Sequence, residues 1–93
     1  MMPTTGIPNG TIMHILLKTE FRTQTRGYTL FIERDLFGDL SIVRCWYGLY
    51  NRRGGHKREL VADFEQACDV YRRIVARRLC RGYAQLHEHE AAA

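Results

Sequence analysis

The sequence has few of the residues and patterns that mark several large classes of protein. It has no apolar run near the ~20 residues of a membrane-spanning helix, and its only two prolines lie in the first eight residues. Its three cysteines, Cys45, Cys68 and Cys80, never form a CxxC pair or show metal-ligand spacing. Residues 1–11 lack the basic start and apolar core of a signal peptide. We therefore expect a protein of the reducing cytoplasm that does not enter a membrane.

Patterns that indicate catalysis are also missing. His87 and His89 flank Glu88, which is not the HExxH arrangement of a zinc enzyme, and no phosphate-binding P-loop occurs. Each cysteine lies where a strand or helix would use a small apolar residue, without the base and orienting group that a nucleophile needs. We therefore expect no enzyme, and no catalytic residue, metal, cofactor or small-molecule substrate.

The length of 93 residues is enough for one domain with one modest core. The prolines and glycines near the start predict a flexible leader at residues 1–13. The end of the chain, which finishes in His-Glu-His-Glu-Ala-Ala-Ala, predicts a C-terminal tail at residues 84–93 with the character of a fraying helix. The folded domain is therefore expected at residues 14–83.

Basic residues are concentrated in one part of the chain. The whole sequence has 14 Lys and Arg against 10 Asp and Glu, a net charge of +4. Residues 44–81 hold ten of the basic and four of the acidic residues, so this part carries an excess of six positive charges. Such clustering attracts polyanions, and nearly all of it is arginine, which pairs with phosphate through two N–H groups.

Hydrophobic periodicity predicts a small α+β fold. Apolar residues with a period of two indicate four strands, at about residues 15–21, 28–34, 40–47 and 57–61. Gly38 provides the bend between the second and third strands, because glycine takes positive φ freely. The fold class that we expect is a small antiparallel sheet of about four strands with one long C-terminal helix packed on one face.

The helix is predicted at residues 63–81. Asp63 is a good N-cap, Gln66 completes a capping-box pattern, and Gly82 is suited to ending the helix. An apolar stripe at helical spacing consists of Phe64, Ala67, Cys68, Tyr71, Ile74, Val75 and Leu79. Arg78 falls within this stripe, where we expect a structural use of its side chain.

Several motifs, in order and at sensible spacing, resemble a WGR domain over about residues 28–83. They are Asp-Leu-Phe-Gly at residues 35–38, Ser41 to Arg44 leading to Trp46, Arg-Gly-Gly at residues 53–55 and Arg-Gly-Tyr at residues 81–83. WGR domains occur in poly(ADP-ribose) polymerases and as small free-standing bacterial proteins, which this chain resembles in length. The resemblance implies a small antiparallel sheet with one helix.

The signature triplet departs from the family pattern. Aligned on Trp46 it reads Trp46-Tyr47-Gly48, and counted back from Arg53 it reads Tyr47-Gly48-Leu49, so its arginine is missing in either register. In the polymerases, the tryptophan and arginine of the triplet contact DNA at a strand end. The resemblance therefore assigns a DNA contact to Trp46 alone, with Arg52 or Arg53 as a replacement for the missing arginine.

The sequence predicts a nucleic-acid-binding surface with weak sequence preference, DNA being the expected ligand. Its predicted residues are Arg44, Trp46, Tyr47, Arg52, Arg53, Lys57 and Arg58. Trp46 has a second interpretation as a core residue, because either face of its strand could be buried. The loop arginines have a second interpretation as a solvated loop, and Arg73, Arg77 and Arg81 as a soluble helix face. The alternative function is a protein-interaction module that docks on an acidic partner or on a second copy of itself.

Overall fold

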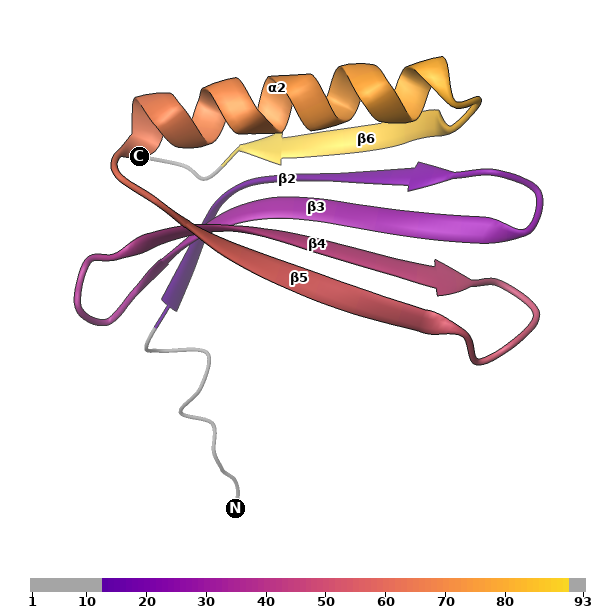
Figure 1. Ribbon diagram of the computed structural model, residues 1–93, viewed down its shortest axis with the longest axis horizontal. Coiled ribbons are helices and arrows are strands. Elements are labelled where there is room, and N and C mark those ends of the chain that lie inside the picture. The colour runs from indigo at the N-terminus through magenta and orange to yellow at the C-terminus, as the bar shows by residue number, and fades with distance from the viewer. Residues whose placement is uncertain (1–12, 91–93) are drawn as a thin grey trace.

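The computed structural model describes residues 13–90 and consists mostly of one antiparallel sheet (Figure 1). Its elements are β2 (Met13–Arg22), β3 (Arg26–Asp35), β4 (Leu40–Gly48), β5 (Gly54–Val61), α2 (Phe64–Cys80) and β6 (Ala84–Glu90). The five strands lie in the order β5-β4-β3-β2-β6. The helix α2 therefore connects the two edge strands, and no helix within residues 13–90 is long and apolar enough to cross a membrane.

The prediction of about four strands and a long C-terminal helix is wrong. The sheet has five strands, and the helix has 17 residues and is followed by β6 instead of a fraying helical tail. The residues of β6 are all exposed, and its Ala, Gln, Leu and Glu side chains favour helix. They form a strand because β2 offers a backbone edge. Thr19 supports this pairing: its hydroxyl donates to the His87 carbonyl at 2.8 Å and accepts from the Gln85 amide at 2.8 Å.

The hairpin turn between β3 and β4 is the one that the sequence predicts. Gly38 has φ of +87°, which confirms its role as the bending residue. One carboxylate oxygen of Asp35 accepts from the backbone N–H groups of Phe37 at 2.8 Å and Asp39 at 3.0 Å. These bonds replace ladder partners inside the turn and set the register in which β4 follows β3.

The helix begins and ends close to the predicted residues. The Asp63 side chain caps it by accepting from the N–H of Gln66 at 2.8 Å, and the Gln66 side chain accepts from the N–H of Ala62 at 2.6 Å. At the other end, Gly82 has φ of +90°, as a helix-terminating glycine requires. The chain can therefore turn sharply into β6.

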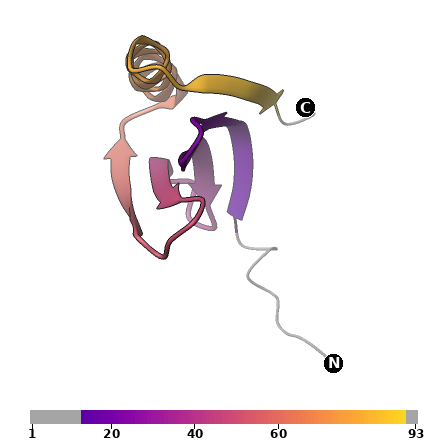
Figure 2. The ribbon, with the colours of Figure 1, turned by 90° about the vertical axis from the view of Figure 1, so that its right-hand side faces the viewer.

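The core lies between α2 and the sheet. Figure 2 shows that the sheet curls and that α2 lies between the edge strands β5 and β6. The buried core residues are Phe21, Tyr28, Leu30, Ile32, Ile42, Ala67 and Tyr71. On the face of β4 that turns toward the helix, Leu40 and Ile42 are buried, but the next two positions are Arg44 and Trp46, which are more exposed. On β4 the apolar core therefore ends before the strand does, although Phe21 and Tyr28 continue it on β2 and β3.

Candidate functional site

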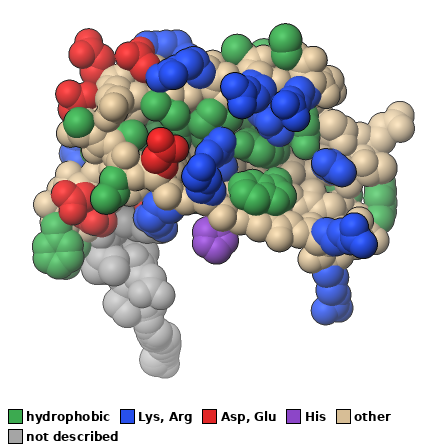
Figure 3. Space-filling model, viewed as in Figure 1, with side chains coloured by type: hydrophobic (Ala, Val, Ile, Leu, Met, Phe, Trp, Pro, Cys, Tyr) green, Lys and Arg blue, Asp and Glu red, His purple; other side chains and the backbone are tan. Residues whose placement is uncertain are grey.

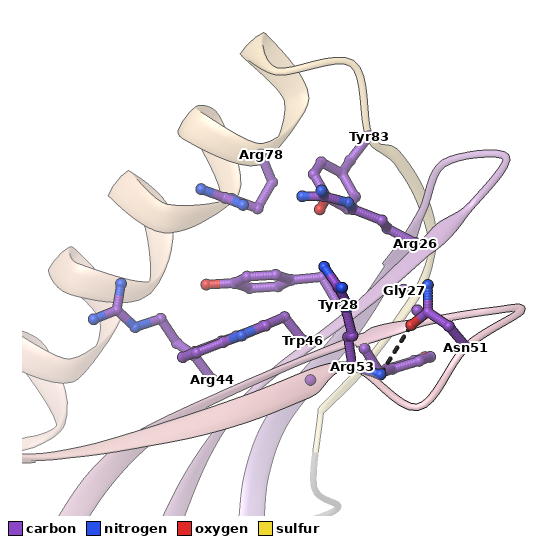
Figure 4. A pocket seen from close by; sticks show the side chains of 12 residues that line it. Arg26, Gly27, Tyr28, Arg44, Trp46, Asn51, Arg53, Arg78 and Tyr83 are labelled. Carbon is purple, nitrogen blue, oxygen red and sulfur yellow. Dashed lines mark hydrogen bonds between the residues drawn. The ribbon is translucent and has the colours of Figure 1, made fainter.

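An open pocket of about 530 Å³ lies where the core ends (Figure 4). It lies between the last turns of α2 and the end of the sheet formed by the β2–β3 and β4–β5 loops. Its lining is aromatic and basic, and consists of Arg26, Gly27, Tyr28, Arg44, Trp46, Tyr47, Gly48, Asn51, Arg53, Gly54, Arg78 and Tyr83. We call these residues the arginine–aromatic pocket.

Trp46 is 42% exposed, and its indole lies close to the backbone of β5 at Gly55. Its cross-strand partners are Tyr28 on β3 and Gly55 on β5. A Cβ atom added to Gly55 would be 3.0–3.2 Å from three atoms of the indole ring, and one added to Gly54 would be 2.5 Å from the Trp46 carbonyl oxygen. The two glycines lie outside the four predicted strands, but they form the start of β5. The missing side chain of Gly55 makes room for the indole, and that of Gly54 makes room for the backbone of β4.

Arg78 lies on the helix side of the pocket between two tyrosine rings. Its guanidinium carbon is 4.6 Å from the ring centre of Tyr28 and 5.4 Å from that of Tyr83, distances that allow cation–π attraction. The two rings meet edge to face with centres 6.0 Å apart. The Arg78 Nε is buried, and no residue of the described chain accepts a hydrogen bond from it. The guanidinium therefore has an aromatic ring on each of two sides, and its Nε–H has no acceptor among the described residues.

Two loops are tied together at the open end of the pocket. The N–H of Leu49 donates to the Thr25 carbonyl at 2.9 Å, which joins the β4–β5 loop to the β2–β3 loop. Within the β4–β5 loop, the Asn51 side chain accepts from the N–H of Arg53 at 2.8 Å, and the Arg53 carbonyl accepts from the N–H of Gly48 at 2.8 Å. The backbone that carries Arg53 is therefore fixed, although its side chain is exposed.

A second hollow of about 170 Å³ continues from the pocket along the underside of α2. It shares Tyr28, Arg44 and Arg78 with the first, and its other lining residues are Glu59, Val70, Arg73, Ile74 and Arg77. Arg73 and Arg77 therefore line this hollow as well as being exposed on the helix surface. We call the two hollows together the arginine groove.

Positive charge in the groove is only weakly balanced. Six arginines line the two hollows, and Glu59 is the one carboxylate that the structure places in their lining. None of the ion pairs found within residues 13–90 involves any of these six arginines. In Figure 3, basic side chains gather along the helix and the neighbouring sheet surface, whereas most acidic ones lie toward the end where α2 begins.

The structure brings together four of the seven predicted site residues. Arg44, Trp46, Tyr47 and Arg53 line the pocket. Lys57 is exposed and pairs with Arg44 across the strands, which places both side chains on one face of the sheet. Arg52 is exposed in the β4–β5 loop and does not line the pocket.

Arg58 has a different environment from the other predicted residues. It lies on the face of β5 opposite Lys57, where it forms an ion pair with Glu33, a residue that is only 1% exposed. Alternation along a strand sends neighbouring side chains to opposite faces, so the run of basic residues at 56–58 is divided between two surfaces. Arg58 therefore compensates a buried carboxylate instead of adding to the groove.

Other pocket residues were not predicted as part of a site. They are Arg26, Gly27, Tyr28, Gly48, Asn51, Gly54, Arg78 and Tyr83. Arg78 had a signal in the sequence, because its helical phase places a charge within the apolar stripe. The period of two along its strand marks Tyr28 as an ordinary core residue, and it is only 4% exposed. Only its cross-strand pairing with Trp46 shows that it lines the pocket.

Two groups with shifted pKa values lie away from the pocket. Burial raises the pKa of the Tyr71 phenol, and the hydrogen bond that it donates to Glu88 at 2.9 Å raises it further. Burial also raises the pKa of the Cys68 thiol.

Across residues 13–90, no three His, Cys, Asp or Glu side chains come close enough together to hold a metal ion.

Comparisons with known proteins give no match. No protein-family model matches the chain, and neither a curated protein nor a solved structure is significantly similar to it.

Proposed function

We propose that this protein is a non-enzymatic, WGR-like module of the cytoplasm that binds nucleic acid, DNA in particular, through the arginine–aromatic pocket. One observation carries the proposal: four arginines and an exposed tryptophan line one open pocket, and no carboxylate of the described residues lines it with them. Phosphate groups supply the charge that these arginines lack, and nucleobases or sugars supply a flat partner for the indole.

The physical roles of the two kinds of side chain differ. Arginine pairs with phosphate through its planar fork of N–H groups, and each such contact releases a condensed counterion from the nucleic acid. This term gives affinity without reading the base sequence. A stacking contact on Trp46 adds about 1–3 kcal/mol and tolerates any base. We therefore expect weak sequence preference and strong salt dependence.

The resemblance to WGR domains supports the same function. It assigns the DNA contact to Trp46, the residue whose indole is open to solvent at 42% exposure. The arginine missing from the triplet has candidate replacements in Arg53 and Arg78, which line the same pocket.

Binding of labelled DNA at about 50 mM salt, measured by fluorescence anisotropy, tests the proposal. The variant Arg26→Glu/Arg53→Glu removes two arginines of the pocket. Its matched control, Arg34→Glu/Arg72→Glu, changes two exposed arginines outside the groove, and each pair lowers the net charge from +4 to zero. We expect the first variant to lose most of its affinity for duplex DNA, with a log–log salt slope smaller by about 1.8.

The control should lose much less affinity, because its changes alter only the long-range field. Equal losses in the two variants would show that net charge alone, and not the pocket, attracts DNA. Absence of binding by the unmodified protein to both single-stranded and duplex DNA would reject the proposal.

The protein-interaction alternative uses the same surface, since arginine and aromatic residues are also enriched at protein interfaces. The two functions separate in the double variant Arg52→Ala/Arg53→Ala. Weaker capture of a protein partner with unchanged retention of DNA favours the alternative, and weaker retention of DNA favours the proposal.

A further inference from the structure

The two hollows of the arginine groove adjoin each other at three shared residues, which we call the constriction. The hollows, of about 530 and 170 Å³, share Tyr28, Arg44 and Arg78, so an extended ligand that lies across these residues contacts both hollows. The larger hollow lies within the ~300–1,000 Å³ typical of small-molecule sites and has the indole on one wall. The smaller hollow runs beneath α2, with Arg73 and Arg77 along its helix side.

The constriction itself has the character of an anion site. Figure 4 shows Arg78 on the helix side of Tyr28, with Arg44 and Trp46 on the other side. Both guanidinium groups line both hollows, and neither has an acidic partner within residues 13–90. Arg78 is partly exposed and lines both hollows, so its guanidinium can donate to a phosphate oxygen there.

The position of the indole limits which form of nucleic acid can stack a base on it. In a duplex, every internal base has both faces covered by its stacked neighbours, so only its edges are accessible in the grooves. Trp46 lies in a pocket bounded by α2 on one side and the β4–β5 loop on the other, and it is 42% exposed. A base can stack on the exposed indole if it is unpaired, or if it belongs to the terminal pair of a duplex, whose outer face is uncovered.

We propose that the arginine groove binds a single strand of nucleic acid, with one unpaired base stacked on Trp46, its phosphate between Arg44 and Arg78, and the neighbouring phosphates on Arg73 and Arg77. This inference rests on the proposed function and adds the form of ligand. Site sizes of about 4–16 nucleotides are usual for single-strand grooves, and the placement proposed here engages about three or four phosphates. The expected log–log salt slope with single-stranded DNA is then between about −2 and −3, from about −0.7 per contact.

Competition between forms of DNA tests the inference. A labelled oligo(dT) of about 12 nucleotides is bound to the protein and displaced, at equal phosphate concentration, by one of three competitors. The competitors are the same oligo without label, a blunt duplex, and relaxed covalently closed plasmid, which has neither ends nor unpaired bases. Fluorescence of Trp46, the only tryptophan in the chain, is recorded with each form.

The single strand should compete about tenfold or more better than either duplex form, and it alone should quench Trp46 fluorescence. Equal competition by blunt duplex or by plasmid overturns the inference, while the proposed function stands because DNA is still bound. Absence of binding to every form overturns both. The outcomes are therefore distinguishable in one titration series.

A pair of variants tests the path along the helix. In Arg73→Gln/Arg77→Gln, two exposed arginines of the smaller hollow lose their charge, and the salt slope with oligo(dT) should shrink by about 1.4. The control Arg34→Gln/Arg72→Gln changes two exposed arginines outside the groove and should leave the slope unchanged. An unchanged slope in the first variant would mean that the strand does not follow α2, and would overturn the proposed path.

Discussion

Replacement of Trp46 by alanine removes the aromatic face of the pocket and leaves its arginines in place. The indole is 42% exposed, so its loss removes a contact available to a ligand as well as a partly buried packing contact. Stacking of a base on an aromatic side chain contributes about 1–3 kcal/mol, and each 1.4 kcal/mol is a tenfold change in Kd. We therefore expect Trp46→Ala to weaken binding of oligo(dT) about 5- to 150-fold, measured by fluorescence anisotropy at about 50 mM salt.

Tyr50→Ala is the matched control for this variant. Tyr50 is an aromatic residue of the β4–β5 loop that is 82% exposed and does not line the pocket, so its removal should leave the affinity unchanged. The salt slope of Trp46→Ala should equal that of the unmodified protein, because no phosphate contact has been removed. Thermal unfolding establishes that both variants are folded at the assay temperature. Equal affinities of the two folded variants would refute the reasoning.

Three further predictions concern the framework of the site. Arg58→Ala leaves the buried Glu33 carboxylate without its ion pair and should lower the free energy of unfolding by about 3 kcal/mol in urea titrations, the low end of the range for buried pairs because Arg58 is half exposed. Gly55→Val should displace the indole, weaken DNA binding and shift the tryptophan emission to longer wavelength, since even a Cβ there is 3.0 Å from the ring. Burial raises the pKa of Tyr71 above its ordinary ~10, so the folded state keeps the phenol proton at pH values where the unfolded state loses it. The contribution of Tyr71 to the free energy of unfolding is therefore fully present below pH ~10 and is lost as the pH rises beyond it. Tyr71→Phe should remove that part of the pH dependence of unfolding.

Local chemistry was sufficient to predict many elements of the fold. The N-cap at Asp63, the helix-ending glycine at Gly82 and the bend at Gly38 all depend on neighbours within a few residues, and the structure has each of them. The fifth strand depends instead on Thr19, which is 68 residues from its hydrogen-bond partner His87. Local preference in residues 84–90 favours helix, so no pattern within that segment indicates the edge to which it binds.

The candidate site was predictable only in part, for a similar reason. Both faces of β4 mix polar and apolar side chains, so its period of two does not show that Trp46 faces the helix side. The position of Arg78 depends on the register that places Tyr28 and Tyr83 around it. Arg58 belongs to a basic run in the sequence, but strand alternation and the buried Glu33 place it on the other surface.

A proton–nitrogen correlation NMR spectrum during titration with oligo(dT) tests the central claim most directly. Trp46 gives the only indole N–H signal of the protein, and the Nε–H signal of Arg78 reports the constriction of the groove. Both signals should move together and saturate at the same DNA concentration, because one ligand contacts both side chains. Shifts confined to the exposed loop and edge residues, with the indole and Arg78 signals unmoved at saturation, would contradict the claim that the arginine groove is the binding site.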